Sequence, residues 1–487
     1  MVAPLIVLAM RHDLLLQRVF GLATTLALAV LAWVMLIAVD GPQAYFVGDW
    51  PAPFGVALVL DRLATLMLAL TAGLALVVQV YAIASGWDAR GQHFHALFLF
   101  QLMGLNGAFL TADAFNLFVF FEVLLIASYG LMIHGGGRDR LRAGVQYVAF
   151  NLIGSTLFLF ALATIYSVTG TLNMADLALR VATLPPGDTA MLRVAGVLML
   201  LVFAVKGALV PLQFWLPGTY ANAPGPVAAL FAVMTKVGAY AVIRVYAMAF
   251  PAGTAATGTL FADLLMPAAL VTVVIGSVGV LGAATMARQA AFAGIASMGA
   301  LFAAVAAFEP QATSAALYYL IHSTLAGAAL FLVVDMVARR RGDGGLTGPT
   351  LPFAQSGLLA ALFLAAAVAL AGTPPLSGFI GKLLVLDALR DDMVLVWSVI
   401  LAGSFLMILG FARAGSHVFW KSAASAPSDD RHQAEPLALT AIFVLIAGLV
   451  GLTVFAGPVT RWLDDTAQGL HDPAAYIGAV MARAEEG

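Results

Sequence analysis

Residues 114–133 read AFNLFVFFEVLLIASYGLMI, twenty residues with one charged side chain, Glu122. The apolar core of a bilayer is about 30 Å thick, and a helix of roughly 20 mostly apolar residues crosses it. This stretch therefore predicts a membrane-spanning helix. Twelve further stretches have the same character: 19–39, 55–84, 94–112, 144–169, 190–217, 226–250, 260–285, 290–308, 312–338, 356–390, 394–420 and 436–457.

The composition of the whole chain agrees with thirteen such spans. Of 487 residues, 62% are hydrophobic and only 10% are charged, whereas a soluble globular protein carries about 25% charged residues. The formal net charge of −2 gives no sign of a nucleic-acid-binding surface. The absence of cysteine excludes disulfides, thiolate nucleophiles and iron–sulfur ligation by cysteine. We therefore expect an all-α, polytopic protein of the cell (inner) membrane.

Basic residues in the loops test this map, since Lys and Arg concentrate on the cytoplasmic side. The apolar segment 1–10 is half the usual length, and we count it as a short first helix of about 14. With this helix included, loops with many basic residues alternate along the chain with loops that have fewer. One set holds thirteen basic residues and is assigned to the cytoplasm: Arg11, Arg18, Arg90, Arg138, Arg140, Arg142, Arg288, Arg339, Arg340, Arg341, Arg413, Lys421 and Arg431. The other set holds seven: Arg62, Arg180, Arg193, Arg244, Arg390, Arg461 and Arg483.

Two of the predicted spans contain prolines that interrupt a helix, because proline lacks the N–H group that continues it. Pro211 and Pro217 stand in helix 7, and Pro374 and Pro375 in helix 12. Irregular backbone at membrane depth is tolerated where it is buried or lines a wet cavity, and paired breaks are typical of inverted-repeat transporters. We therefore expect inverted five-helix repeats at about 94–250 and 260–420, within a single membrane domain 1–457. A short polar tail is expected at 458–487.

Lysine is rare in this chain, and three of its four lysines fall inside predicted spans. They are Lys206, Lys236 and Lys382, whereas the fourth, Lys421, lies in a loop. A charge at the bilayer centre costs about 2.5–3.5 kcal/mol on insertion scales, so such residues usually serve a function. A buried lysine can release its proton, whereas arginine stays charged. Three buried lysines therefore suggest a proton relay.

Two other ionisable residues join them. Glu122 is the only glutamate near the middle of a span, and Lys206 is its expected partner. His322 stands about ten residues into its span, and an imidazole can pass protons near neutral pH. Structural alternatives remain open: a static Glu122–Lys206 pair, Lys236 reaching toward an interface, Lys382 on an exposed break and His322 as a packing residue. Asp61, Arg62 and Asp113 stand at span ends and are expected to be anchors.

Three motifs resemble a known family. They are Asp113 to Tyr129 around Glu122, Ala232-Val-Met-Thr-Lys236-Val-Gly-Ala-Tyr, and Gly372-Thr-Pro-Pro-Leu-Ser-Gly-Phe-Ile-Gly-Lys382. The chain resembles the antiporter-like subunits shared by respiratory complex I and Mrp antiporters over residues 50–420. Its motif forms are most similar to those of the D subunit of Mrp-type (Pha-type) monovalent cation/proton antiporters.

The resemblance implies roles for the ionisable residues. Glu122 and Lys206 would form the charge pair of a first half-channel, Lys236 the central relay, His322 part of the central axis and Lys382 the gate of the second half-channel. The expected function is proton translocation in a multisubunit Na⁺ or K⁺/H⁺ antiporter, with other antiporter subunits as partners and no cofactor. The sequence assigns no metal site and does not choose between Na⁺ and K⁺. The alternatives are a proton-pumping subunit of an NADH–quinone oxidoreductase or membrane-bound hydrogenase, or a membrane scaffold with vestigial charges.

Overall fold

The computed structural model describes residues 2–184, 189–251, 256–342, 344–347, 353–421 and 435–482. Arg431 and Arg483, two of the basic residues used to orient the chain, lie outside these ranges. Within them, eleven helices are long and apolar enough to cross a membrane. The predicted all-α membrane fold is confirmed, while the count of fourteen spans stays a prediction.

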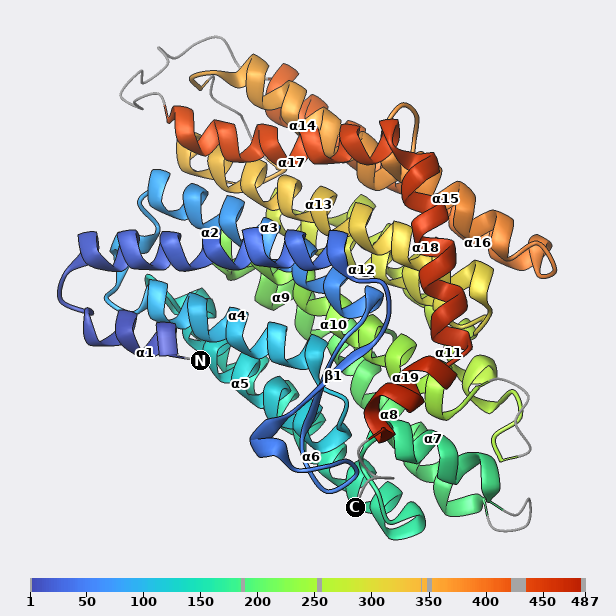
Figure 1. Cartoon of the computed structure of the whole chain (residues 1–487). Helices are drawn as coiled ribbons and strands as arrows, with labels where there is room; N and C mark the ends of the chain where they lie inside the picture. Colours follow the sequence, from blue (N-terminus) through green and yellow to red (C-terminus); the bar gives the residue numbers. More distant parts are fainter. Residues whose placement is uncertain are drawn as a thin grey trace.

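The N-terminal part forms a helical layer with one small hairpin (Figure 1). Its elements are α1 (Val2–Ala9), α2 (Leu14–Ala38), β1 (Gln43–Phe46), η1 (Val47–Asp49), β2 (Ala57–Leu60), α3 (Arg62–Ala84) and η2 (Asp88–Arg90). The strands pair antiparallel, with Gln43 opposite Leu60. The span predicted from residue 55 thus begins as a strand. Helix α3 begins only after Asp61, whose carboxylate accepts a hydrogen bond from the Ala64 N–H (2.8 Å) and caps the helix.

Apart from α7, which has no described counterpart in the second stretch, the two stretches predicted to be repeats have a similar order of long and short helices. The first contains α4 (Phe94–Leu110), α5 (Ala114–Met132), α6 (Arg138–Thr169), α7 (Met174–Thr183), α8 (Ala190–Gly207), α9 (Trp215–Asn222) and α10 (Gly225–Ala249). The second contains α11 (Leu260–Gly282), α12 (Met286–Val305), α13 (Pro310–Arg341), α14 (Ser356–Ala371), α15 (Ser377–Ala388), α16 (Met393–Gly415) and the π-helical turn η3 (Ser416–Trp420). The inverted symmetry itself stays a prediction.

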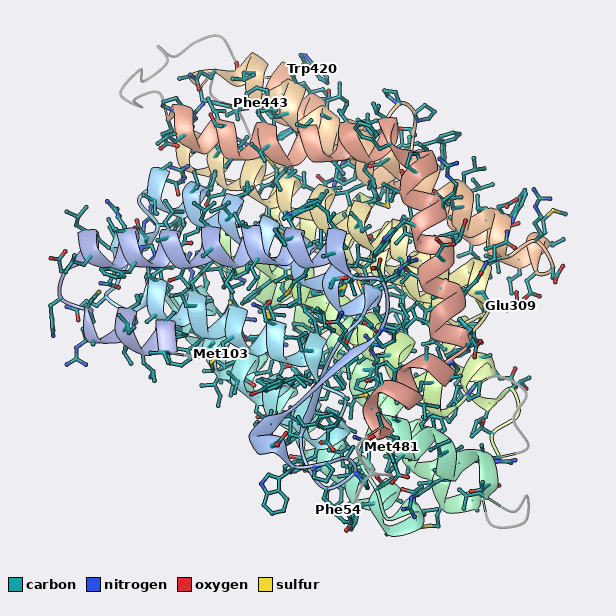
Figure 2. All side chains as sticks on the ribbon, viewed as in Figure 1. Phe54, Met103, Glu309, Trp420, Phe443 and Met481 are labelled. Carbon is teal, nitrogen blue, oxygen red and sulfur yellow. The ribbon has the colours of Figure 1, made fainter. Side chains whose placement is uncertain are left out.

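The centre of the bundle is α10, in which every residue from Pro226 to Ala249 is buried. It packs against α3, α4, α7, α8, α12 and α13. Its approach to α8 is very close, because a Cβ atom at Gly238 would stand 2.7 Å from the Phe203 carbonyl oxygen. The outside of the bundle is apolar: Phe443 and Trp420 lie at its periphery (Figure 2) and are 47% and 70% exposed. A lipid-facing surface is expected to have this character.

The C-terminal part contains α17 (Pro436–Val454), α18 (Ala456–His471) and α19 (Ala474–Met481). The residues expected to be a polar tail from 458 on are thus helical as far as Met481. In Figure 1, α18 runs across the ends of the long helices, and it contacts α13 and α10. Helix α19 packs against β1 and α7. The two helices cover one end of the central helix α10.

Candidate functional site

The three intramembrane lysines are all buried, on three different helices. Lys206 is the penultimate residue of α8, Lys236 is in the middle of α10 and Lys382 is in α15; their exposed fractions are 8%, 3% and 8%. The burial of Lys236 disfavours the alternative in which it reaches an interface. It has no hydrogen-bond or ion-pair partner among the residues that the structure describes.

Helix α6 holds the first pair of charges, through two polar residues that the sequence reasoning missed. The Ser155 hydroxyl donates a hydrogen bond to the Glu122 carboxylate, and the Lys206 ammonium donates to Asn151 Oδ1 (3.0 Å). No direct ion pair joins Glu122 to Lys206 in the described part of the chain. Asn151 and Ser155 are four residues apart, so α6 holds the two charges about one helical turn from each other.

A small cavity lies beside the Lys206 side chain. It is about 10 Å³ in size, close to the minimum that admits one water molecule, and its wall includes Asn151, Tyr147, Trp215 and Tyr220. The indole of Trp215 donates to the carbonyl oxygen of Val205 (3.0 Å), next to the point where α8 ends. The end of α8 therefore borders a small, mostly apolar space into which Lys206 and Asn151 bring polar atoms.

The segment between α14 and α15 supplies a carbonyl group for Lys382. The Lys382 ammonium donates to the Ala371 carbonyl oxygen (2.8 Å) and to Ser404 Oγ on α16 (2.7 Å). The lysine stem lies against Gly372, where a Cβ atom would stand 2.4 Å from Lys382 Cδ. Gly372 also has φ +78°, so glycine suits this position for both reasons. Lys382 is therefore held inside the bundle and is not on an exposed break.

The predicted prolines stand at or next to the ends of these helices. Pro211 lies between α8 and α9, and Pro374 and Pro375 lie between α14 and α15. Pro217 is the third residue of α9, inside the first turn, where a missing N–H does not interrupt the helix. Pro217 therefore lies inside α9, the helix that starts after the non-helical segment that follows α8.

His322 lies in α13, which packs against both α10 and α15. One ring nitrogen, Nδ1, is 2.9 Å from Ser377 Oγ, at the start of α15, the helix that carries Lys382. The other nitrogen, Nε2, is buried with no hydrogen-bond partner in the described part of the chain. His322 thus contacts the helix that carries Lys382, and its own helix α13 packs against α10, which carries Lys236. Glu122 and Lys206 are held separately, by α6.

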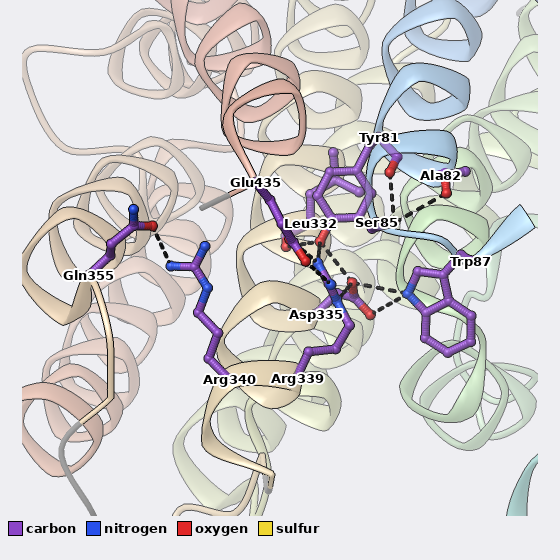
Figure 3. Close-up of polar contacts among 10 residues, drawn as sticks. All are labelled: Tyr81, Ala82, Ser85, Trp87, Leu332, Asp335, Arg339, Arg340, Gln355 and Glu435. Carbon is purple, nitrogen blue, oxygen red and sulfur yellow. Dashed lines mark hydrogen bonds and ion pairs between the residues drawn. The ribbon is translucent and has the colours of Figure 1, made fainter. Parts of the chain in front are cut away.

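A second polar cluster lies at the ends of the helices that carry most of the basic residues, which we call the basic face. Asp335 of α13 accepts hydrogen bonds from Tyr81 Oη (2.7 Å) and Trp87 Nε1 (3.0 Å), and Arg339 binds both Asp335 and Glu435 (Figure 3). The start of α10 lies directly against it, since a Cβ atom at Gly225 would be 2.3 Å from Asp335 Cβ. This cluster fixes α3, α13 and α17 around the first turn of α10.

A buried carboxylate outside the membrane spans also lies at this face. Asp88 of η2 accepts hydrogen bonds from Arg18 Nε (2.6 Å), Arg18 Nη2 (3.0 Å) and His95 Nε2 (3.0 Å). Burial acts to raise the pKa of Asp88, but the hydrogen bonds from His95 and Arg18 outweigh it and lower the pKa to about 2. The carboxylate is therefore ionised in the folded protein.

This shift predicts an acid-sensitive contribution to stability. Because the folded pKa lies below the unfolded value, the contribution is complete above about pH 4 and is lost as the pH falls toward 2. Its size is about 2 kcal/mol. Thermal unfolding in detergent should show Asp88→Asn less stable than wild type at pH 5, with a smaller difference at pH 3. An Asp391→Asn control, at an exposed position, should follow the wild type; equal differences at both pH values would contradict the assignment.

Comparisons with known proteins agree with this architecture. Residues 111–410 match the family described as "NADH:quinone oxidoreductase/Mrp antiporter, TM". The chain is 37% identical to a probable K(+)/H(+) antiporter D subunit of Rhizobium meliloti (strain 1021), over 100% of this chain and 96% of that relative. It is 36% identical to the Na(+)/H(+) antiporter D subunit of Bacillus subtilis (strain 168), over 99% and 97%. A chain of the Mrp complex from Dietzia sp. DQ12-45-1b has a TM-score of 0.88 at 28% identity, covering 98% and 97%.

Proposed function

Because the chain belongs to the NADH:quinone oxidoreductase/Mrp antiporter family, we propose that it is the proton-translocating subunit of a multisubunit monovalent cation/proton antiporter. The observation that carries the proposal is the placement of three buried lysines on three helices, with His322 in contact with α15, the helix of Lys382. Buried ionisable groups in a membrane are expensive and usually mark an ion pathway. The names of two relatives, both antiporter subunits, suggest Na⁺ or K⁺ as the coupled cation.

The proposed mechanism is electrostatic. With Glu122 ionised, its negative charge stabilises the protonated ammonium of Lys206 about one turn away. A proton that arrives at Glu122 removes this counter-charge, so Lys206 then repels a proton held by Lys236. That proton passes through water and His322 toward Lys382. Two unit charges 5–6 Å apart interact by about 3 kcal/mol at an effective dielectric of 20, enough to move a proton between neighbouring groups.

Coupling to the cation follows from the membrane potential. A charge that crosses the membrane exchanges about 2.3 kcal/mol per 100 mV, so inward proton movement can drive a cation outward. The only bonds made and broken are the N–H and O–H bonds to the transferred proton, which the chain's own side chains take up and release. The other subunits of the complex are the proposed partners.

The alternative is the redox branch of the same family, which its description also names. In a redox complex of this kind, the same relay would be driven by quinone reduction or by a hydrogenase reaction in the partner subunits. The antiporter assignment is favoured because three relatives that align with nearly the whole chain are named as D subunits of antiporters.

Everted membrane vesicles separate the two functions. Vesicles with the complete set of antiporter subunits should lose a respiration-generated ΔpH when Na⁺ or K⁺ is added, and vesicles lacking only this chain should keep it. A ΔpH that ignores both cations, together with proton pumping that requires quinone, would assign the chain to the redox branch.

A further inference from the structure

The Lys206 ammonium lies on a neutral acceptor and not on the carboxylate that is its expected partner. It donates to Asn151 Oδ1 (3.0 Å), while the Glu122 carboxylate accepts from the Ser155 hydroxyl. The amide oxygen of Asn151 accepts a hydrogen bond without carrying a charge, whereas an ionised carboxylate supplies a negative charge as well. On Asn151, the positive charge of the ammonium is therefore not neutralised.

The surroundings of Asn151 determine which end of its amide faces the lysine. Its Nδ2 donates to the Tyr147 carbonyl oxygen (2.9 Å), one turn earlier in α6. Because a carbonyl oxygen only accepts, the nitrogen has to face Tyr147, and the amide oxygen is left for Lys206. Tyr147 is itself held by Ser128 of α5 (Oη to Oγ, 2.9 Å) and stacks on Trp215, with 5.4 Å between the ring centres. Asn151, only 1% exposed, is thus a rigidly held acceptor.

The small cavity beside Lys206 connects this acceptor to the central helix. Its wall contains Lys206 and Asn151, and also Met234 and Val237 of α10, which stand on either side of the central lysine in the sequence. Glu122, although described by the structure, is not part of this wall. The amide acceptor, but not the carboxylate, therefore borders a space shared with α10.

The lysine can use both acceptors without any movement of a helix. Asn151 and Ser155 are four residues apart in α6, so the amide oxygen and the carboxylate that Ser155 binds lie about one turn from each other. The Lys206 ammonium stands at the end of a flexible four-carbon chain. Rotation about the bonds of this chain is enough to move it between the two acceptors.

We propose that Asn151 is a positioning residue of the relay, the neutral acceptor that holds the Lys206 ammonium once a proton has neutralised Glu122. The inference rests on the proposed proton-translocating function. On ionised Glu122 the charge of the lysine is compensated, whereas on Asn151 it remains uncompensated beside α10 and acts on Lys236. Without Asn151, the ammonium would have no acceptor at this place, and a buried ammonium in that position gives up its proton or returns to Glu122. Either event removes the repulsion that Lys236 needs to release its own proton.

The test compares two substitutions of Asn151 in everted vesicles that contain the complete complex. Asn151→Leu removes the acceptor and should lower the maximal rate of cation-dependent proton transport by at least about tenfold, because a hydrogen bond to a charged group is lost. Asn151→Asp keeps the shape and the acceptor oxygen but adds a counter-charge, so it should also lower the rate by at least about tenfold. A purely structural hydrogen bond predicts the opposite for Asn151→Asp, since a carboxylate satisfies a buried ammonium at least as well as an amide does.

Two further measurements separate positioning from packing. The half-saturating cation concentration should not change in either variant, because Asn151 acts on a proton-carrying group and not on cation binding. In a Glu122→Gln background, Asn151→Leu should cost less than it does alone, since both residues act on the same ammonium and their effects are not additive. Gln146→Leu is the matched control: it removes an amide from an exposed position of α6 and should transport like wild type at equal assembly.

The possible outcomes are distinct. Full transport by Asn151→Asp at normal assembly overturns the proposal, whatever Asn151→Leu does, because the residue would then be a structural partner only. If Asn151→Leu does not assemble, Asn151→Asp, which has the same shape, decides alone. A wild-type complex that exchanges no cation for protons contradicts the antiporter function. The same variants are then compared on quinone-dependent proton pumping, where a loss in Asn151→Asp supports the role of Asn151 and normal pumping overturns it.

Discussion

Lys236→Ala is expected to reduce cation-dependent proton transport by about 100-fold, to near the background of vesicles that lack the complex. Without the lysine, a proton has to cross the centre of the bundle with no side chain to carry it. A charge at this depth costs about 2.5–3.5 kcal/mol, and each 1.36 kcal/mol is a factor of ten in rate. The measurement is the initial rate of ΔpH collapse on adding Na⁺ or K⁺ to everted vesicles.

The chain offers a matched control for this variant. Lys421 is the one lysine outside the predicted spans, and its side chain is exposed. Lys421→Ala should transport like wild type at equal assembly of the complex, judged by co-purification of the other subunits. Normal assembly and full transport by Lys236→Ala would favour the scaffold alternative, in which the buried charges are vestigial.

Glu122→Gln is expected to lower transport by at least about tenfold. The glutamine keeps the shape of the side chain and can still accept a hydrogen bond from Ser155, but it removes the negative charge near Lys206. The lost interaction is about 3 kcal/mol at one helical turn and a dielectric of 20, so the loss is bounded at about 100-fold. The assay is the same ΔpH collapse, with assembly measured in parallel.

Two further variants distinguish charge coupling from packing. Glu122→Asp keeps the charge and should recover part of the rate, because the carboxylate is only one methylene group further from Ser155. Ser155→Ala keeps the charge and removes one hydrogen bond, so its effect should be smaller than that of Glu122→Gln. If Glu122→Gln transports normally, the pair with Lys206 is a static packing device, and the first half of the proposed relay has no support.

The sequence could predict that this is a membrane protein and where its main helices lie, because the length of an apolar stretch can be read from that stretch alone. The predicted span 226–250 and the observed α10 differ by one residue at each end. The lysines stood out for the same reason, since each interrupts an apolar run. The hairpin β1–β2 was missed because Ala57–Leu60 is as apolar as the helix that follows it, and only the Asp61 cap marks the true start.

The partners of the buried charges were not predictable in the same way. Asn151 and Ser155 are spaced as one helical face, a signal available in the sequence, but nothing local shows that this face meets α5 and α8. The carbonyl of Ala371 becomes a partner of Lys382 only because α14 ends there and Gly372 permits a close approach. Asp61 pairs with Arg244, which lies 183 positions further along the chain. The sequence analysis treated Asp61 as an anchor at the end of its own span, so it could not identify this partner.

The complete enclosure of α10 has a consequence for biogenesis. Helix α10 carries two charged residues, Lys236 and Arg244, and none of its sides faces lipid. Such a helix is not expected to be stable alone in the bilayer after it leaves the translocon. Its neighbours on both sides in the chain, α8 before it and α12 and α13 after it, form its surroundings. We therefore expect the central helix to reach its final place only once later-synthesised helices close around it, so that the proposed proton pathway is completed late in assembly.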